Sequence, residues 1–284
     1  MSVTVAEALR AAAVRLTAAG VADATRDARR LMAEALGVSP DRLTLVSSDP
    51  MTREAADRLK PMVEARAERH PVSHILGRRA FWGRDFTVTP DVLDPRPETE
   101  ILIERALSGP PPRRLLDLGT GSGAILVTLL AEWPDGAGTG TDMSDAALAV
   151  AAGNARRHGV ADRAGFRRAD WFDGMDGQFD LIVSNPPYIP RAEIADLAPE
   201  VRLHEPATAL SPGPEGLEAC RRIAGGLARA LAPGGRALIE IGAGQGDAAR
   251  AVFEAAGAGP VVLHPDLDGR DRVVEIRRSE YVST

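Results

Sequence analysis

The chain has 284 residues, with 34 Lys and Arg against 40 Asp and Glu and a net charge of -6. It is long enough for two domains that each have a core. The acidic balance disfavours a large sequence-independent nucleic-acid surface, which needs many cations against phosphates, and the single cysteine, Cys220, excludes an intrachain disulfide and a cysteine metal cluster.

The first 70 residues are predicted to form a helical bundle. Apolar residues such as Val5, Leu9 and Leu16 recur at helical spacing, and Thr52 opens a later helix with a capping pattern. No catalytic pattern lies in this region. We therefore expect residues 1–70 to form a domain that recognises the substrate.

Residues 71–112 change character and are predicted to form a β-hairpin and a linker. The hairpin is expected between Phe81 and Val88, where aromatic and β-branched residues gather. A stiff, proline-rich turn follows at residues 94–100 and leads into a short helix. The prolines at 110–112 mark the break before the last domain.

From residue 113 to residue 284, strand-like and helix-like segments alternate. The apolar runs at 114–118 and 179–184 indicate buried strands, and the segment that begins at Ala124 indicates a helix between them. Alternation of this kind predicts an α/β fold with a mostly parallel, doubly wound sheet.

A glycine-rich turn joins the first of these strands to its helix and is the candidate cofactor loop. Glycines allow positive φ and let a ligand approach the backbone closely. Asp142 ends the next strand, where a carboxylate can accept hydrogen bonds from ribose hydroxyls. The loop residues expected to hold the cofactor are Asp117, Gly119, Thr120, Gly121, Ser122 and Gly123.

Such a loop is also compatible with a packing turn or with a dinucleotide site. The spacing is G-x-G-x-G rather than G-x-G-x-x-G, and acidic Asp117 suits a cation better than a pyrophosphate. A sulfonium nucleoside carries positive charge and has no phosphate, so S-adenosylmethionine is the predicted cofactor. After the third strand, Asp170 and Trp171 could contact the adenine amine and ring face, although Trp171 could equally belong to the core.

The tetrapeptide Asn185-Pro186-Pro187-Tyr188 follows a buried strand and predicts a rigid acceptor site. The prolines fix φ near −65° and Pro187 has no N–H, so carbonyls there are expected to point outward. The Asn185 side-chain oxygen and the Pro186 carbonyl could together accept both hydrogens of a planar –NH2 group. Tyr188 could then cover its face, an arrangement that suits methylation of an amide or an exocyclic amine.

With these motifs in order, the chain resembles the release factor glutamine methyltransferases over nearly its whole length. The discriminating segments are Pro95-Arg96-Pro97-Glu98-Thr99-Glu100 and Glu205-Pro206-Ala207-Thr208-Ala209-Leu210. The resemblance implies a Rossmann-like class I methyltransferase domain behind an N-terminal helical domain. It also implies methylation of the Gln in the Gly-Gly-Gln motif of class 1 peptide release factors, with S-adenosylhomocysteine as the product.

Carried over by position, the resemblance implies roles for individual residues. The glycine loop, Asp142, Trp171 and Asn185 would hold or border the cofactor. Asn185, Pro186 and Tyr188 would perform catalysis, and Pro187 would help them to hold the glutamine. Arg96 is a further candidate for substrate binding, although a structural salt bridge explains it equally well.

Two other functions compete with this interpretation. A nucleic-acid methyltransferase could deliver a flipped base amine to the same motif, although the acidic balance counts against it. A non-catalytic cofactor-binding protein could share the fold, although the intact Asn185 and Tyr188 argue against it. The five histidines show no ligand spacing, and neither a signal peptide nor an apolar run of about 18 residues is present. We therefore expect a cytoplasmic protein with no metal, no membrane contact and no direct nucleic-acid partner.

Overall fold

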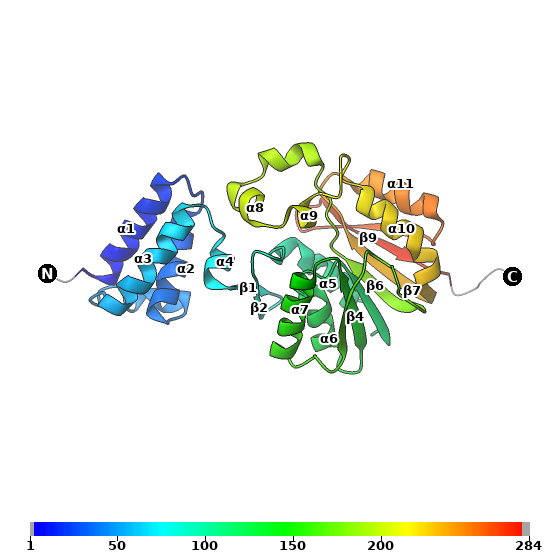
Figure 1. The fold of residues 1–284 in the computed structure, drawn as a ribbon, viewed down its shortest axis with the longest axis horizontal. Helices are drawn as coiled ribbons and strands as arrows, with labels where there is room; N and C mark the ends of the chain where they lie inside the picture. Colours follow the sequence, from blue (N-terminus) through cyan, green and yellow to red (C-terminus); the bar gives the residue numbers. More distant parts are fainter. Residues whose placement is uncertain (1–2, 280–284) are drawn as a thin grey trace. The chain divides into compact units, whose positions relative to one another are not determined.

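The computed structural model describes residues 3–279, which form two compact units (Figure 1). The first unit takes the chain up to Arg78 together with Ala198–His204. The second unit takes Arg79–Leu197 and the chain from Glu205 onward. The chain thus leaves the second unit once, contributes seven residues to the first unit, and returns.

The first unit is helical. Thr4 begins its first helix with a capping box, in which the Thr4 hydroxyl accepts from the Glu7 N–H and the Glu7 carboxylate accepts from the Thr4 N–H. Thr52 caps a later helix by accepting from the Ala55 N–H, as its sequence pattern predicted. The helices of this unit are α1 (Val5–Ala18), α2 (Ala24–Leu36), η1 (Pro40–Thr44), α3 (Arg53–Ala67), α4 (Val72–Leu76) and α8 (Pro199–His204).

The core of the first unit lies between α1, α2 and α3. Leu16 projects from α1, Leu31 and Met32 project from α2, and all three are fully buried, while Leu59 and Val63 of α3 close the cluster. These residues recur at three- and four-residue spacing, so each helix turns one apolar stripe inward. The predicted N-terminal helical domain is therefore present.

A cluster of charged side chains holds α8 in the first unit. The Arg66 guanidinium donates to Asp27 at 2.7 Å and to Glu200 at 2.7 Å, and Arg69 donates to the second Glu200 oxygen at 2.7 Å. Burial alone would raise the pKa of Glu200, but the hydrogen bonds from Arg69 and Arg66 outweigh it and lower the pKa to about 2. Glu200 therefore stays ionised and links α8 to α3.

The second unit begins with a two-stranded hairpin and continues with the large sheet and its helices. The hairpin is formed by β1 (Arg78–Phe81) and β2 (Arg84–Thr87), so it begins three residues before the predicted segment, which started at Phe81. The strands of the sheet are β3 (Arg114–Leu118), β4 (Ala137–Asp142), β5 (Ala164–Arg168), β6 (Phe179–Ser184), β7 (Leu231–Glu240), β8 (Val261–Pro265) and β9 (Asp271–Arg277). The helices are η2 (Pro97–Thr99), α5 (Glu100–Leu107), α6 (Ala124–Glu132), α7 (Asp145–Arg157), η3 (Arg191–Asp196), α9 (Ala207–Leu210), α10 (Glu218–Ala230) and α11 (Gly246–Ala256).

Within residues 3–279 the sheet has seven strands in the order β5-β4-β3-β6-β7-β9-β8. Neighbouring strands from β5 to β7 are parallel, and β9 runs antiparallel to both β7 and β8. The predicted mostly parallel, doubly wound sheet is confirmed. The strand order reverses between β3 and β6, so the crevice beyond their carboxyl ends is where such sheets bind ligands.

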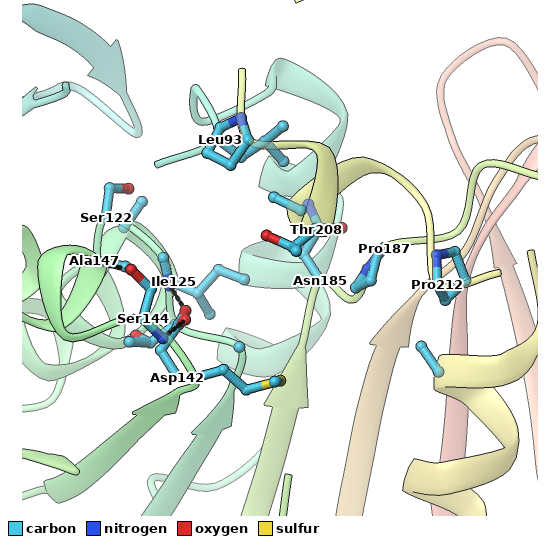
Figure 2. A pocket seen from close by; sticks show the side chains of 18 of the residues that line it. Leu93, Ser122, Ile125, Asp142, Ser144, Ala147, Asn185, Pro187, Thr208 and Pro212 are labelled. Atoms are coloured by element: carbon cyan, nitrogen blue, oxygen red, sulfur yellow. Dashed lines mark hydrogen bonds between the residues drawn. The ribbon is translucent and has the colours of Figure 1, made fainter. Parts of the chain in front are cut away.

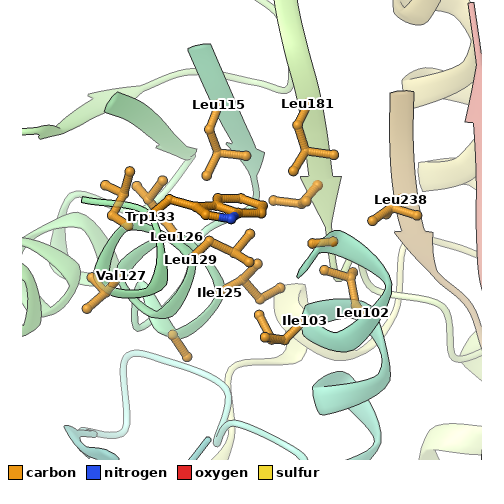
Figure 3. Packing of buried hydrophobic residues seen from close by; sticks show 14 of the residues in the cluster. Leu102, Ile103, Leu115, Ile125, Leu126, Val127, Leu129, Trp133, Leu181 and Leu238 are labelled. Atoms are coloured by element: carbon orange, nitrogen blue, oxygen red, sulfur yellow. The ribbon is translucent and has the colours of Figure 1, made fainter. Parts of the chain in front are cut away.

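Apolar side chains alternate between the two faces of this sheet, and helices cover both. Leu115, Leu181 and Leu238 face α5 and α6, and Figure 3 shows Leu115 and Leu181 pointing from their strands towards Trp133. Leu116 and Ile182, one position along, belong to the opposite cluster with α10 and α11. A parallel sheet needs this double cover because both of its faces are apolar. No helix of residues 3–279 combines the length and the apolar character needed to span a bilayer.

Replacing Glu200 with Gln tests the charged cluster. We expect the free energy of unfolding at pH 7 to fall by about 1–3 kcal/mol, because Arg66 and Arg69 lose an ionic acceptor in a largely buried place. The folded-state pKa of Glu200 lies below its unfolded value, so its contribution is present above pH 4.5 and fades as the pH falls towards about 2. Urea titrations at pH 7 and pH 3 measure this, with Glu193→Gln on exposed η3 as the control. If Glu200→Gln lowered the free energy of unfolding equally at pH 7 and pH 3, the stabilising role of the ionised Glu200 would be contradicted.

Candidate functional site

A cavity of about 560 Å³ lies at the carboxyl edge of the sheet in the second unit. Leu118 of β3 pairs with both Thr141 of β4 and Ser184 of β6, so the loops that follow these strands leave the sheet at one level. Figure 2 shows Asp142 on one side of the cavity and Asn185 on the other. The sequence-predicted residues that line it are Gly119, Thr120, Gly121, Ser122, Asp142, Asp170, Trp171, Asn185 and Pro187.

The glycine loop turns its bare backbone to the cavity. Gly119 and Gly121 have φ of 70° and 53°, a region that favours glycine, and a Cβ placed on either would meet no atom within 4 Å. Beneath the loop, the Thr120 hydroxyl donates to Asp117 at 2.6 Å. Burial raises the pKa of Asp117 to about 7, against the lowering effect of Thr120. Asp117 thus fixes the loop from below and does not itself line the cavity.

Asp142 supports the loop and still offers oxygen to a ligand. One carboxylate oxygen accepts from the Gly121 N–H at 2.9 Å, and the other accepts from the Ser144 N–H at 2.9 Å (Figure 2). A carboxylate has about four lone-pair sites, so each oxygen retains one for a hydroxyl. Ser144 caps α7 by accepting from the Ala147 N–H, which holds the Asp142 turn in place.

The backbone at Trp171 takes an uncommon conformation beside the cavity. Its φ is 55°, which is rare for a bulky residue and must be held by its surroundings. Next to it, one oxygen of Asp170 accepts from Arg222 at 2.6 Å, and the other is buried without a partner among residues 3–279. The turn therefore presents an aromatic ring together with a free acceptor.

Asn185 presents a second free acceptor. Its Nδ2 donates to the Thr99 hydroxyl at 3.0 Å, while its Oδ1 is buried and lacks a partner in the described part of the chain. Gln245 fixes the other end of the segment Asn185–Tyr188, since its Nε2 donates to the Tyr188 carbonyl at 2.9 Å. A buried oxygen left open in this way has a high desolvation cost, which a ligand N–H would offset.

Some predicted residues lie outside the cavity lining. Asn185 and Pro187 line the cavity, but Pro186 and Tyr188 do not, and Gly123 lies against Ala151 of α7. Their predicted roles in catalysis, substrate binding and cofactor binding remain predictions.

Arg96 also lies outside the lining, where it forms an ion pair with the almost fully buried Glu205 at 2.5 Å. Burial raises the pKa of Glu205 to about 7, although Arg96 pulls it down. This salt bridge joins the two segments that carried the family resemblance. It fits the structural interpretation of Arg96 that the sequence left open.

Several lining residues escaped sequence reasoning. Leu93, Thr99, Thr208 and Pro212 come from segments that precede α5 or follow η3, far along the chain from the glycine loop. The Pro-Arg-Pro-Glu-Thr-Glu and Glu-Pro-Ala-Thr-Ala-Leu segments signalled that these regions matter. Neither contains a periodicity that would have placed its side chains at the cavity.

The cavity suits a positively charged nucleoside better than a pyrophosphate. In the described lining, five carboxyl side chains accompany one guanidinium, that of Arg222, which is already paired with Asp170. The carboxyl groups are those of Asp91, Asp94, Asp142, Asp170 and Glu218. Such a field attracts a sulfonium and repels phosphate. Within residues 3–279, no group of three or more His, Cys, Asp and Glu side chains is placed to hold a metal ion.

Comparison with known proteins agrees with this geometry. The family model of the PrmC N-terminal domain matches residues 7–77, and that of the methyltransferase small domain matches residues 92–215. A release factor glutamine methyltransferase from Cereibacter sphaeroides is 58% identical over 272 residues, which cover 96% of this chain and 98% of the relative. One from Caulobacter vibrioides is 44% identical over 278 residues, covering 96% of each. A crystal structure of a methyltransferase from Pyrococcus furiosus shares the fold, with a TM-score of 0.53, 16% identity, and coverage of 70% of this chain and 91% of that one.

Replacing Asp142 with Ala tests the cofactor side of the cavity. We expect affinity for S-adenosylhomocysteine to fall by about tenfold to a hundredfold, because hydrogen bonds to a charged group contribute about 1.5–3 kcal/mol. Isothermal titration calorimetry measures the change. Asp145→Ala is the matched control, since Asp145 lies three residues on and its carboxylate is exposed beside Arg168. Unchanged affinity in the Asp142 variant would remove this residue from the cofactor site.

Proposed function

The chain belongs to the release factor glutamine methyltransferase family, and on that basis we propose its reaction. It transfers a methyl group from S-adenosylmethionine to the side-chain amide nitrogen of the Gln in the Gly-Gly-Gln motif of class 1 peptide chain release factors, and so tunes translation termination. The observation that carries this proposal is the unpartnered Asn185 oxygen in the acidic cavity beside the glycine loop. Because release factors act during translation, we propose that the protein is cytoplasmic.

The cofactor would occupy the glycine-loop side of the cavity. Asp142 would accept from ribose hydroxyls, the free Asp170 oxygen would accept from the adenine amine, and Trp171 would lie against the ring. Gly119 and Gly121 would give the ligand close access to the backbone. When bound, S-adenosylmethionine supplies a methyl group that its sulfonium activates.

The protein's task is to aim a poor nucleophile. An amide nitrogen shares its lone pair with the carbonyl, so its direction towards the methyl carbon matters greatly, and orientation can supply roughly 7–11 kcal/mol. Asn185 Oδ1 and the Pro186 carbonyl would accept the two amide hydrogens, and Tyr188 would border the group. These dipoles also favour the positive charge that develops on nitrogen during transfer.

The same acceptors distinguish Gln from Glu. A carboxylate would bring no hydrogen to either oxygen, and each buried acceptor left unpaired costs about 1–3 kcal/mol. Thr99 reinforces the choice because it already binds the amino side of the Asn185 amide. Asn185 is therefore held with its oxygen, not its nitrogen, available to the substrate.

The alternative functions are not favoured. The relatives that match over nearly the whole chain are named as protein-modifying enzymes, and the net charge is -6. We therefore propose a protein substrate and no direct nucleic-acid partner. Parallel incubations of the enzyme and labelled cofactor with release factor and with nucleic acid distinguish the two, and label in nucleic acid alone would overturn the proposal.

The helical unit is proposed to grip the release factor away from its Gly-Gly-Gln loop. It carries the match to the PrmC N-terminal domain, yet every residue that lines the cavity belongs to the second unit. A binding role away from the chemistry fits both facts. Because α8 belongs to the same unit, a clean test must remove it together with the N-terminal helices.

Asn185→Ala should abolish methylation while S-adenosylhomocysteine affinity stays within about threefold of wild type, because the variant loses only the acceptor that aims the glutamine. Mass spectrometry of a release factor after incubation with enzyme and cofactor measures the product. A release factor with Glu in place of the target Gln is the negative control. Wild-type-like rates in the Asn185 variant would contradict its assignment.

Deleting residues 1–78 and replacing residues 198–204 with a glycine–serine link should raise the KM for the release factor tenfold or more, which corresponds to about 1.4 kcal/mol of binding. Cofactor affinity should be unchanged, because the complete cavity lining remains. Steady-state kinetics and calorimetry measure the two quantities. If the KM for the release factor stayed at the wild-type value, the helical unit would have no recognition role.

A further inference from the structure

The hydrogen bond between Asn185 and Thr99 leaves the direction of the Asn185 amide undecided. A threonine hydroxyl can accept from the amide nitrogen or donate to the amide oxygen. Only the first arrangement leaves Asn185 Oδ1 free, as the structure has it. Something must therefore engage the Thr99 proton elsewhere so that Thr99 meets Asn185 as an acceptor.

The local backbone does not use that proton. Thr99 lies at the junction of η2 and α5 and is almost fully buried, with 3% of its surface exposed. It occupies the N-cap position of α5, but its side chain makes no capping hydrogen bond. The usual role of a threonine at a helix start is therefore absent here.

Glu240, the last residue of β7, provides the missing acceptor. Its side chain is completely buried, and neither carboxylate oxygen has a partner at full hydrogen-bond geometry within residues 3–279. Ile239 of β7 pairs with Ser184 of β6, so Glu240 and Asn185 are the next residues on two neighbouring strands. The Thr99 and Tyr188 hydroxyls lower the pKa of Glu240, as hydrogen-bond donors to its carboxylate do. An ionised carboxylate only accepts hydrogen bonds, so it draws both hydroxyl protons towards itself.

We propose that Glu240 is a positioning residue for the methyl transfer. Its carboxylate accepts a hydrogen bond from the Thr99 hydroxyl. Thr99 then acts as an acceptor for Asn185 Nδ2, and Asn185 Oδ1 stays turned to the substrate. The inference rests on the proposed function, because the oxygen so presented is the one that would hold the glutamine amide. It assigns the orientation of the Asn185 side chain to a residue that does not line the cavity.

Tyr188 acquires a second role in this arrangement. Burial raises its pKa to about 12, and the neighbouring Glu240 adds to the shift, so the phenol remains a donor at any working pH. Its hydroxyl lowers the pKa of Glu240, and its carbonyl accepts a hydrogen bond from Gln245. In this arrangement the Glu240 carboxylate stabilises both ends of the segment Asn185–Tyr188, through Thr99 at Asn185 and through the hydroxyl of Tyr188.

The charges around Glu240 decide when it acts. Burial raises its pKa to about 7, while the Thr99 hydroxyl and the Arg272 guanidinium from β9 lower it, and Glu98 from η2 raises it again. Above this value the carboxylate is ionised and accepts from Thr99. As the pH falls through it, the protonated carboxyl becomes able to donate to Thr99, which frees the Thr99 hydroxyl to turn towards Asn185 Oδ1.

Four variants of the full-length enzyme test the proposal, with kcat for release factor methylation as the readout. Glu240→Met removes the acceptor at similar volume and should lower kcat by about thirtyfold or more. Glu240→Gln mimics the protonated carboxyl, because its amide can donate to Thr99, and should lower kcat at pH 8 to the level that wild type reaches at pH 6. Thr99→Val should match the Met variant, and Thr99→Ser should remain within threefold of wild type.

Two measurements separate positioning from mere structural support. S-adenosylhomocysteine affinity and the thermal midpoint should stay near wild type in all four variants, since the cofactor side is untouched. Wild-type kcat should fall as the pH drops from 8 to 6, and Glu240→Gln should lose the part of that fall that Glu240 causes. Asp117 and Glu205 also have a pKa of about 7 and contribute to the pH dependence of both enzymes. Only the difference between the wild-type and Glu240→Gln profiles is therefore assigned to Glu240.

The outcomes are decisive in each direction. Wild-type kcat in Glu240→Met, wild-type kcat in Glu240→Gln at pH 8, or a parallel loss of cofactor affinity and thermal midpoint would each overturn the proposal. Identical pH profiles for wild type and Glu240→Gln would do the same. The same assay tests the proposed function separately. If the wild-type enzyme does not methylate the release factor, the proposed function is overturned. If wild type and all four variants methylate it equally well, only the role of Glu240 is overturned.

Discussion

The shared level at which β3, β4 and β6 end is the constraint on which the site depends. Parallel pairing places Leu118, Thr141 and Ser184 side by side, so the glycine loop, Asp142 and Asn185 emerge together. None of these groups lies near another along the chain. The two apolar clusters that clamp the sheet keep this level fixed, because shifting a strand by one residue would exchange its buried faces.

Buried acids are a second theme of the site. Asp117 lies under the glycine loop, Glu205 pairs with Arg96 beside the cavity, and Glu240 lies behind Asn185, and each has a pKa raised to about 7 by burial. A raised carboxyl pKa means that ionisation in the folded state opposes stability as the pH rises towards neutrality. The fold thus gives up some stability to keep acceptors inside, and each of them fixes a loop that a ligand would touch.

The sequence predicted the elements better than their partners. The helical bundle, the hairpin and the parallel sheet follow from local periodicity and capping, and Thr52 caps its helix as expected. The short helices α8 and α9 were not foreseen, because segments of six and four residues are too short to show a helical apolar stripe. That α8 belongs to the helical unit depends on Glu200 meeting Arg66 and Arg69, more than 130 residues away in sequence.

The sequence by itself determined the family, the cofactor class and the residues of the two main loops, since glycine spacing, a strand-end acid and a proline-locked Asn are local signals. Only the tertiary structure decided which side of Asn185 is open, that Arg96 is paired with Glu205, and that Glu240 is completely buried at the end of β7. These facts depend on contacts between distant segments. Hydrogen-bond direction and burial belong to the packed molecule, and no periodicity along the chain encodes them.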